Sequence, residues 1–211
     1  MAVTFKNTKG KAQKSSPDAY TYVDGENVVR LFGGILPRYL YWLKMGMKPF
    51  PLECLAFSRE VEKFNNLETD WVPEFFPDLK CSWAYSINCI DPKDGKAKVL
   101  NLKKKLFNQI MAAAEDLEAD PTDPDTGFDI SFKKTKTGSN PFDVEYTLSV
   151  LKCKKRALTP EEREVIAKEP SIDEKFPRQT PEEQKLILEK LAKGKEEDID
   201  PATDKEAVSD L

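Results

Sequence analysis

The chain has 211 residues, of which 39% are hydrophobic and 33% are charged, a composition typical of a water-soluble domain with a sizeable core. It contains no histidine, which excludes Ser-His and Cys-His catalytic arrangements, and no apolar run approaches the roughly 20 residues that a transmembrane helix needs. The net charge of −4 hides an asymmetry, because residues 1–160 carry 24 Lys and Arg against 21 Asp and Glu, whereas residues 161–211 carry 9 against 16.

Residues 1–17 predict a flexible basic arm. Lys6, Lys9, Lys11 and Lys14 stand among small and polar residues, a composition that does not support a packed structure. No apolar stretch follows these lysines, so the segment does not have the pattern of a secretory signal. We therefore expect a cytoplasmic protein.

Residues 18–158 predict a β-rich core. Alternating or apolar runs predict strands at residues 27–32, 35–45, 52–57, 81–90, 96–102, 128–134 and 144–152. Gly33-Gly34 predicts a bend or bulge, and the polar insertion 58–79 predicts a short helix at 59–65. Residues 104–117 predict a longer helix, because apolar residues recur there at helical spacing. The fold class is therefore mainly β with flanking helices (α+β), an OB-fold-like Greek-key barrel with an inserted helix.

Residues 159–193 predict short helices, and residues 194–211 an acidic C-terminal tail. Thr159-Pro160-Glu161-Glu162 has a capping threonine, proline at the first helical position and glutamate at the third. Thr180-Pro181-Glu182-Glu183 repeats this pattern, so two helices are expected on the core.

One short run combines aromatic rings with cations. Single-stranded nucleic acid is held by cations on phosphates and by rings that stack on bases, and residues 38–44 (Arg-Tyr-Leu-Tyr-Trp-Leu-Lys) offer both. Strand alternation places Arg38, Trp42 and Lys44 on one face and Tyr39 and Tyr41 on the other. Because two cations are unfavourable in a dry core, the first face is the candidate binding face and the two tyrosines are expected in the core.

For other candidates the sequence pattern alone does not distinguish a binding role from a structural one. Trp83 and Tyr85 share a face with Ile87, which fits a core strand as well as a stacking surface. Basic residues form three clusters, at 103–105, at 133, 134 and 136, and at 152 and 154–156. Each lies at the end of an expected element, so a small barrel would gather them along one groove, although charge runs are more often solvated faces.

Enzymatic and metal-binding functions find little support. The four cysteines form no CxxC pair, the acidic residues between 116 and 125 have no ordered spacing, and no nucleotide-binding glycine motif is present. We expect no catalytic residues, no cofactor and no metal. A protein-interaction adaptor, or a module for duplex DNA or RNA, remains the alternative to single-stranded DNA binding.

Four segments between residues 24 and 158 resemble the single-stranded DNA-binding (helix-destabilising) proteins of large tailed bacteriophages, whose core is an OB-fold. The similar segments are residues 25–32 with Arg30, residues 82–92 from the Ser-Trp-Ala-Tyr run to its Asp-Pro turn, residues 95–107 with paired lysines, and residues 134–146. Better-known members carry a zinc-ribbon insertion, but residues 52–80 contain only Cys54 and no histidine, so no zinc is expected here.

The resemblance implies that Arg30, Trp83, Lys104, Lys105, Lys136 and Phe142 line a groove for single-stranded DNA. Together with the pattern-based candidates, the predicted nucleic-acid-binding residues are Arg30, Arg38, Trp42, Lys44, Trp83, Tyr85, Lys103, Lys104, Lys105, Lys134, Lys136, Phe142, Tyr146 and Lys154. The resemblance also implies a basic arm for cooperative self-association and an acidic tail that recruits replication or recombination proteins, with a role in phage DNA replication, recombination and repair.

Overall fold

The computed structural model describes residues 18–45, 48–139 and 143–192. The predicted basic arm, the acidic tail and Phe142 lie outside these residues. In this described part of the chain, no helix has the length and apolar character needed to cross a bilayer.

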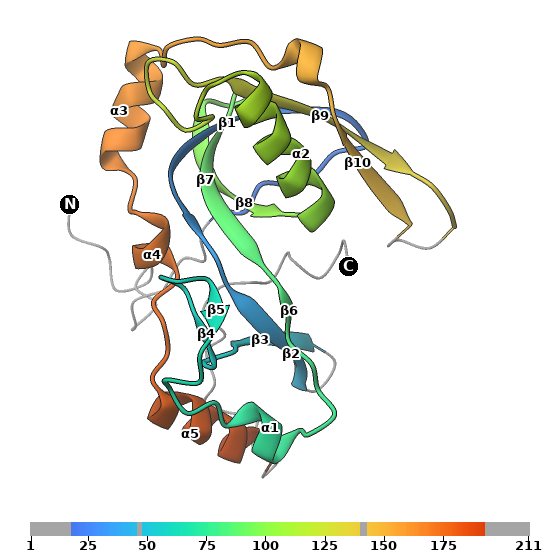
Figure 1. Cartoon of the computed structure of the whole chain (residues 1–211), viewed down its shortest axis with the longest axis vertical. Coiled ribbons are helices and arrows are strands. Elements are labelled where there is room, and N and C mark those ends of the chain that lie inside the picture. Colours follow the sequence, from blue (N-terminus) through green and yellow to red (C-terminus); the bar gives the residue numbers. More distant parts are fainter. Residues whose placement is uncertain (1–17, 46–47, 140–142, 193–211) are drawn as a thin grey trace, which may run out of the picture.

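A five-stranded antiparallel sheet forms the larger lobe (Figure 1). Its strands are β1 (Gly25–Leu36), β7 (Tyr85–Asp91), β8 (Lys96–Leu102), β9 (Asp129–Lys136) and β10 (Val144–Leu148), in the order β10-β9-β1-β7-β8. Helix α2 (Lys104–Asp116) joins β8 to β9 and buries Leu106, Ile110 and Ala113. The expected mainly β, α+β class is confirmed, and the architecture is OB-like, but the sheet is not closed into a barrel because β8 and β10 do not pair.

Residues 18–22 lie along the open edge of β8. The backbone of Val99 donates to Asp18 O and accepts from Tyr20 N, both at 2.8 Å, which adds a short parallel bridge to this edge. The Tyr22 hydroxyl donates to Asn101 O at 2.7 Å, while its ring centroid lies 5.0 Å from that of Tyr146 on β10. This segment therefore spans the gap between the two unpaired edge strands.

A smaller lobe is inserted between β1 and β7. It contains a three-stranded sheet of β2 (Tyr39–Met45), β3 (Lys48–Glu53) and β6 (Ser82–Trp83). It also contains a hairpin whose two strands, β4 (Phe57–Ser58) and β5 (Lys63–Phe64), have two residues each, and the short helix α1 (Val72–Phe75). The β1–β7 register shifts between Phe32 and Ile35, and Gly33 has φ +71°, so the predicted bulge is confirmed. Ile35 and Leu36 still pair with β7 after the bulge, and the chain then enters the small sheet at Tyr39.

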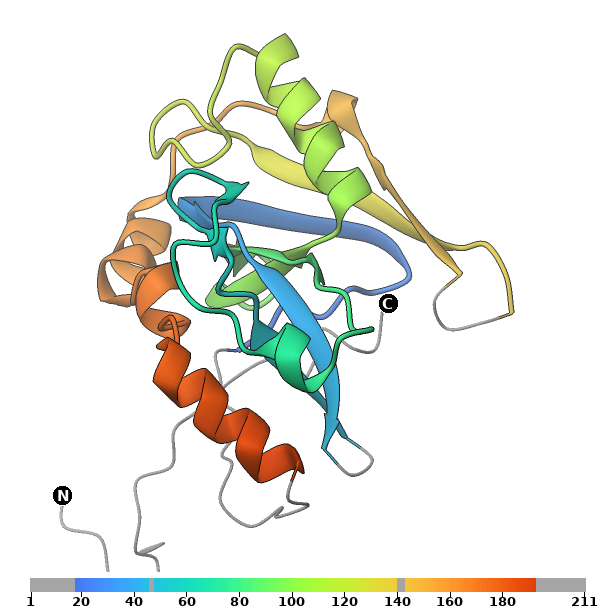
Figure 2. The same ribbon diagram turned by 60° about the horizontal axis from the view of Figure 1, so that its bottom comes forward.

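The C-terminal helices follow the two lobes in turn. Figure 1 shows α3 (Pro160–Lys168) beside the larger lobe, α4 (Ile172–Lys175) between the lobes and α5 (Pro181–Ala192) under the smaller one, and Figure 2 shows the length of α5. Both predicted capping boxes are present: Glu162 N and Glu183 N donate to the Thr159 and Thr180 hydroxyls, each at 3.2 Å.

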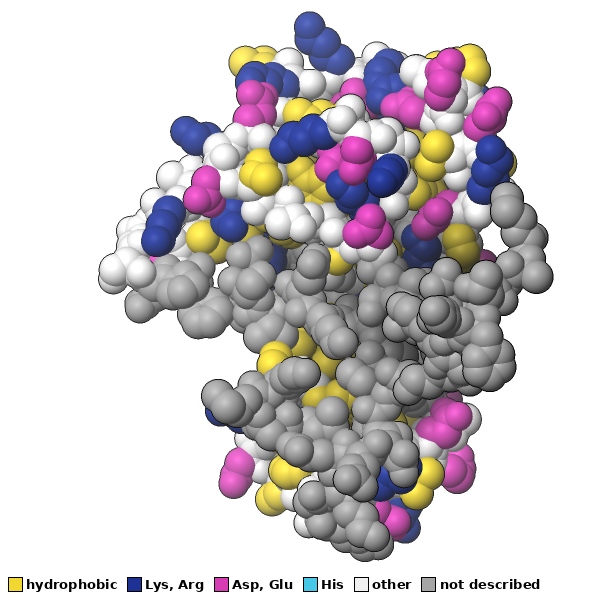
Figure 3. Space-filling view, turned by 180° about the vertical axis from the view of Figure 1, so that it is seen from behind, with side chains coloured by type: hydrophobic (Ala, Val, Ile, Leu, Met, Phe, Trp, Pro, Cys, Tyr) yellow, Lys and Arg dark blue, Asp and Glu magenta, His cyan; other side chains and the backbone are white. Residues whose placement is uncertain are grey.

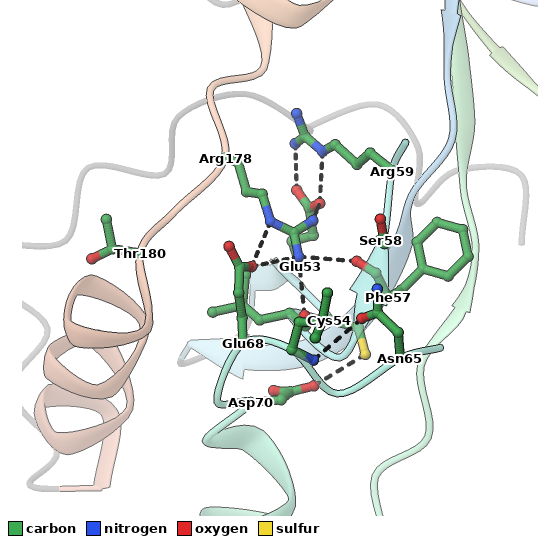
Figure 4. Close-up of polar contacts among 12 residues, drawn as sticks. Glu53, Cys54, Phe57, Ser58, Arg59, Asn65, Glu68, Asp70, Arg178 and Thr180 are labelled. Carbon is green, nitrogen blue, oxygen red and sulfur yellow. Dashed lines mark hydrogen bonds and ion pairs between the residues drawn. The ribbon is translucent and has the colours of Figure 1, made fainter. Parts of the chain in front are cut away.

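A buried carboxylate attaches the C-terminal segment to the smaller lobe (Figure 4). Glu53, only 7% exposed, accepts from Arg59 Nε and from Arg178 Nη1, both at 2.8 Å. Arg178 also donates to the carbonyls of Leu55 and Phe57 at 3.0 and 2.9 Å. Because arginine side chains donate to the Glu53 carboxylate and to both of these carbonyls, the segment that leads into α5 is held against the small sheet.

The structure corrects the expected elements in the insertion. The helix predicted at 59–65 is wrong: Phe57 pairs with Phe64 and Ser58 with Lys63, so these residues turn a hairpin. The strand predicted at 52–57 instead occupies 48–53, and it tolerates Pro49 and Pro51 because β3 is an edge strand.

Two further differences lie near the C-terminus. The strand predicted at 144–152 ends at Leu148 and is followed by a short 3-10 helix, η1 (Val150–Lys152). Helix α4 was not expected, although Ser171 and Glu174 form the same type of capping box as the two predicted ones.

Candidate nucleic-acid interface

An open cleft of about 270 Å³ lies where the two sheets meet. Its walls come from β2, β6, the start of β7, the end of β8 and the start of α2. It is lined by Arg38, Leu40, Trp42, Ser82, Trp83, Ala84, Tyr85, Asn101, Leu102, Lys103 and Lys104. Six of the fourteen predicted nucleic-acid-binding residues therefore line one cleft, although they come from three distant stretches of sequence.

Trp42 is held in a fixed orientation at the cleft. Its indole Nε1 donates to Ser82 Oγ at 3.1 Å, and the Ser82 hydroxyl lies 3.4 Å from Leu40 O. The ring is only partly buried. Because its donor is already bonded inside the sheet, the solvent-facing part of the ring can present a π-face without an orientational cost.

Trp83 lies on the other face of the small sheet, opposite Tyr39 in the β2–β6 pair. Its ring stacks on that of Tyr85, with the ring centroids 4.2 Å apart and an angle of 18° between the planes. The centroid of the Phe107 ring lies 5.5 Å from that of Trp83. Trp83 remains half-buried, whereas Tyr85 is 7% exposed. Since the cleft reaches both tryptophans, it crosses the edge of the small sheet rather than following one face.

Arg38 forms part of the cleft floor rather than its rim. It is 5% exposed, its guanidinium lies 4.2 Å above the centre of the Phe176 ring, and Nη2 donates to Ser86 Oγ at 3.0 Å. Ser86 Oγ in turn donates to the Asn101 side chain at 2.8 Å. The floor is thus a hydrogen-bonded row of polar groups that carries a buried positive charge.

The lysines of the cleft stand at the N-terminus of α2. Lys103 is the N-cap residue and Lys104 the first helical residue, and no acidic side chain occupies the first turn. Positive side chains are unfavourable there, because the helix N-terminus itself carries partial positive charge. An anion bound near this N-terminus would offset that positive charge, which suits a phosphate.

The other predicted residues that the structure describes do not line this cleft. Arg30 is 1% exposed and donates to Asp123 O at 2.6 Å, so it is inaccessible to DNA in this structure and the groove assignment is corrected. Tyr146 is 5% exposed and packs on Tyr22 and Phe132, a core position. Lys44 is exposed on β2 beyond the cleft lining.

Each of the three basic clusters has a lysine outside the cleft lining that pairs with a carboxylate. Lys134 lies 3.7 Å from Asp24, Lys105 pairs with Glu145, and Lys152 pairs with Glu26. Lys136 and Lys154 are exposed outside the cleft lining. Seen from behind, Lys and Arg side chains are interspersed with Asp and Glu over the larger lobe (Figure 3). Only the cluster at 103–105 contributes to the cleft.

Sequence reasoning missed the polar groups that complete the cleft. Ser82 and Asn101 were not singled out, although Asn101 interrupts an apolar run, Val99-Leu100-Asn101-Leu102, and a polar residue inside such a strand marks a hydrogen-bonded position. Among the described residues, no three Cys, Asp or Glu side chains come together as a metal site would require.

The chain is similar in sequence to a known phage protein. A probable ssDNA-binding protein of Escherichia phage T5 is 30% identical over an alignment of 263 residues, which covers 100% of this chain and 99% of the phage protein. No protein-family model matches the chain.

Proposed function

The chain belongs to the same family as the probable ssDNA-binding protein of Escherichia phage T5, and from this membership we propose that it is a phage protein that binds single-stranded DNA in the cleft between its two sheets. The observation that carries this placement is the meeting of two half-buried tryptophans with Lys103 and Lys104 at a helix N-terminus. Rings that stack on bases and cations that neutralise phosphates are the two components that such binding requires.

Binding of this kind is independent of base sequence and needs no catalysis. Every base has a π-face, and lysines contact phosphates that all nucleotides share. Trapping of transiently melted strands then destabilises duplex by mass action and protects the exposed strand. These properties fit a non-enzymatic role in phage DNA replication, recombination and repair in the host cytoplasm.

The two ends of the chain complete the proposal from their sequence. The acidic residues of 194–211 would compete with DNA for the cleft as a tethered polyanion and, once released, recruit replication or recombination proteins. The lysines of residues 1–17 would support self-association along DNA.

The test is an affinity comparison with a fluorescent dT oligomer, its duplex and the equivalent RNA. We expect the unpaired DNA to bind most tightly, Lys104→Ala and Trp42→Leu to weaken binding, and Lys168→Ala to leave it unchanged. Lys168 is a suitable control because it is 78% exposed on α3, outside the cleft lining. Equal affinity for duplex and single strand, or equal affinity of all variants, would contradict the proposal.

A further inference from the structure

The aromatic surface beside the cleft continues onto the small β4–β5 hairpin. Phe64 is 53% exposed, and it is the single aromatic residue among the large exposed apolar side chains of the described chain. Its ring lies 4.9 Å from Tyr39 and 5.3 Å from Phe57, centroid to centroid. One side of the ring is therefore supported by two others while the rest is open to solvent.

Two contacts connect this hairpin to the cleft. Tyr39, which supports Phe64, is the cross-strand partner of Trp83, and directly opposed side chains lie about 5 Å apart at Cβ. At the hairpin turn, Glu62 accepts a hydrogen bond from the hydroxyl of Tyr85, the ring on which Trp83 stacks. Phe64 thus lies one side chain away from Trp83, on the same face of the small sheet.

The hairpin holds Phe64 in a defined backbone geometry. Glu62 and Asn66, which flank the segment on either side, have φ values of +49° and +52°, a left-handed conformation that costs non-glycine residues free energy. Asn65 N donates to Ala56 O at 3.0 Å and closes the turn from the other strand. These backbone constraints hold the Phe64 ring at a position where about half of the residue is exposed to solvent.

We propose that Phe64 is a further base-stacking residue, which extends the single-stranded DNA path from Trp83 over Tyr39 onto the hairpin. This inference rests on the proposed function. Lys63, also exposed, stands next to Phe64 and can contact the phosphate that accompanies the stacked base. The path would leave the cleft at the edge of β6 and end on β5.

The competing occupant of this surface is an apolar protein partner, because Val61 and Leu67 are 56% and 84% exposed in the same segment. The two occupants require different chemistry. A base requires a planar ring, whereas an apolar partner requires buried area that leucine supplies equally well. The substitution Phe64→Leu separates them, and Phe64→Tyr preserves the ring.

The experiment measures dT-oligomer affinity for wild type, F64L, F64Y and the matched control L67A, with thermal unfolding of each. We expect F64L to weaken binding about fivefold or more, the equivalent of losing one stacked base, with F64Y and L67A close to wild type. Wild-type affinity for F64L, or an equal loss in F64Y, would overturn the inference while Trp42→Leu and Lys104→Ala still test the proposed function separately.

A second measurement uses the unaltered chain. Ultraviolet cross-linking to an oligonucleotide that carries 5-bromodeoxyuridine, followed by mass spectrometry, should give an adduct on the peptide that contains Phe64 in addition to the Trp83 peptide. Adducts confined to the Trp42 and Trp83 peptides would overturn the role of the hairpin and leave the cleft intact. Absence of any DNA binding by wild type would instead reject the proposed function itself.

Discussion

Replacement of Glu53 by glutamine should destabilise the smaller lobe far more than the same change at Glu68. Both carboxylates contact Arg178, at 2.8 Å from Glu53 and 2.7 Å from Glu68, but Glu53 is 7% exposed and Glu68 is 45% exposed. Glu53 also binds Arg59, whose side chain is 13% exposed. The neutral amide would remove the buried negative charge that the two guanidinium groups share, and would leave Arg178 only the exposed Glu68 and Arg59 only Asp173, 3.9 Å away.

The expected cost follows from this difference in burial. Removing one partner from a buried ion pair costs about 3–5 kcal/mol, whereas an exposed pair contributes less than about 1 kcal/mol. In urea, Glu53→Gln should lower the unfolding midpoint by about 1 M or more, and Glu68→Gln should barely change it. Limited proteolysis should cut Glu53→Gln first between α4 and α5, where Arg178 is attached.

The reasoning fails if the two variants have the same midpoint. It also fails if Glu53→Gln is destabilised while residues 176–180 resist protease as in wild type, because the structure makes this carboxylate the anchor of that segment.

Three further predictions concern the C-terminal helices and the cleft. Thr159→Ala should remove the α3 capping box and lower the free energy of unfolding by about 1 kcal/mol, measured in urea. The Arg156 guanidinium holds the pKa of Glu162 below its ordinary 4.5. A carboxyl whose pKa is lower in the folded state than in the unfolded state stabilises the fold at pH values above the unfolded pKa. The difference in melting temperature between wild type and Glu162→Gln should therefore be constant at neutral pH and shrink as the pH falls below 4.5. Lys104→Ala should reduce the slope of log affinity against log salt by about 0.7, the value for one phosphate on a single strand, whereas Lys168→Ala should leave it unchanged.

Local signals predicted the regular elements well. The strand at 96–102 and the helix from 104 correspond to β8 and α2, because alternation and helical spacing are strong there and a turn with Gly95 at φ +67° precedes them. The Thr159 and Thr180 capping boxes were predictable for the same reason: each is complete within four residues. The structure of residues 58–65 was not predictable, because strands of two residues are too short for their alternation to be distinguished from a helical turn.

The site was predictable in part, and the division has a physical basis. Alternation predicted Arg38 and Trp42 on one face, and both line the cleft, but it could not show that Arg38 is buried beneath Phe176, a residue from the C-terminal segment. Arg30 is excluded from solvent by the loop that carries Asp123, a contact between residues 93 positions apart. The lysine clusters look equivalent in sequence, but individual lysines differ in their surroundings. Only the structure shows which of them line the cleft and which pair with carboxylates.

The most direct test of the central claim is quenching of tryptophan fluorescence by poly(dT). The chain has three tryptophans; Trp42 and Trp83 line the cleft, whereas Trp71 lies outside its lining, with Lys185 Nζ 4.1 Å above its ring. Trp71→Phe should retain the quenching, weakened by added salt, and the double variant Trp42→Phe/Trp83→Phe should lose most of it. Quenching that persists in the double variant, or that disappears with Trp71 alone, would show that single-stranded DNA does not bind in this cleft.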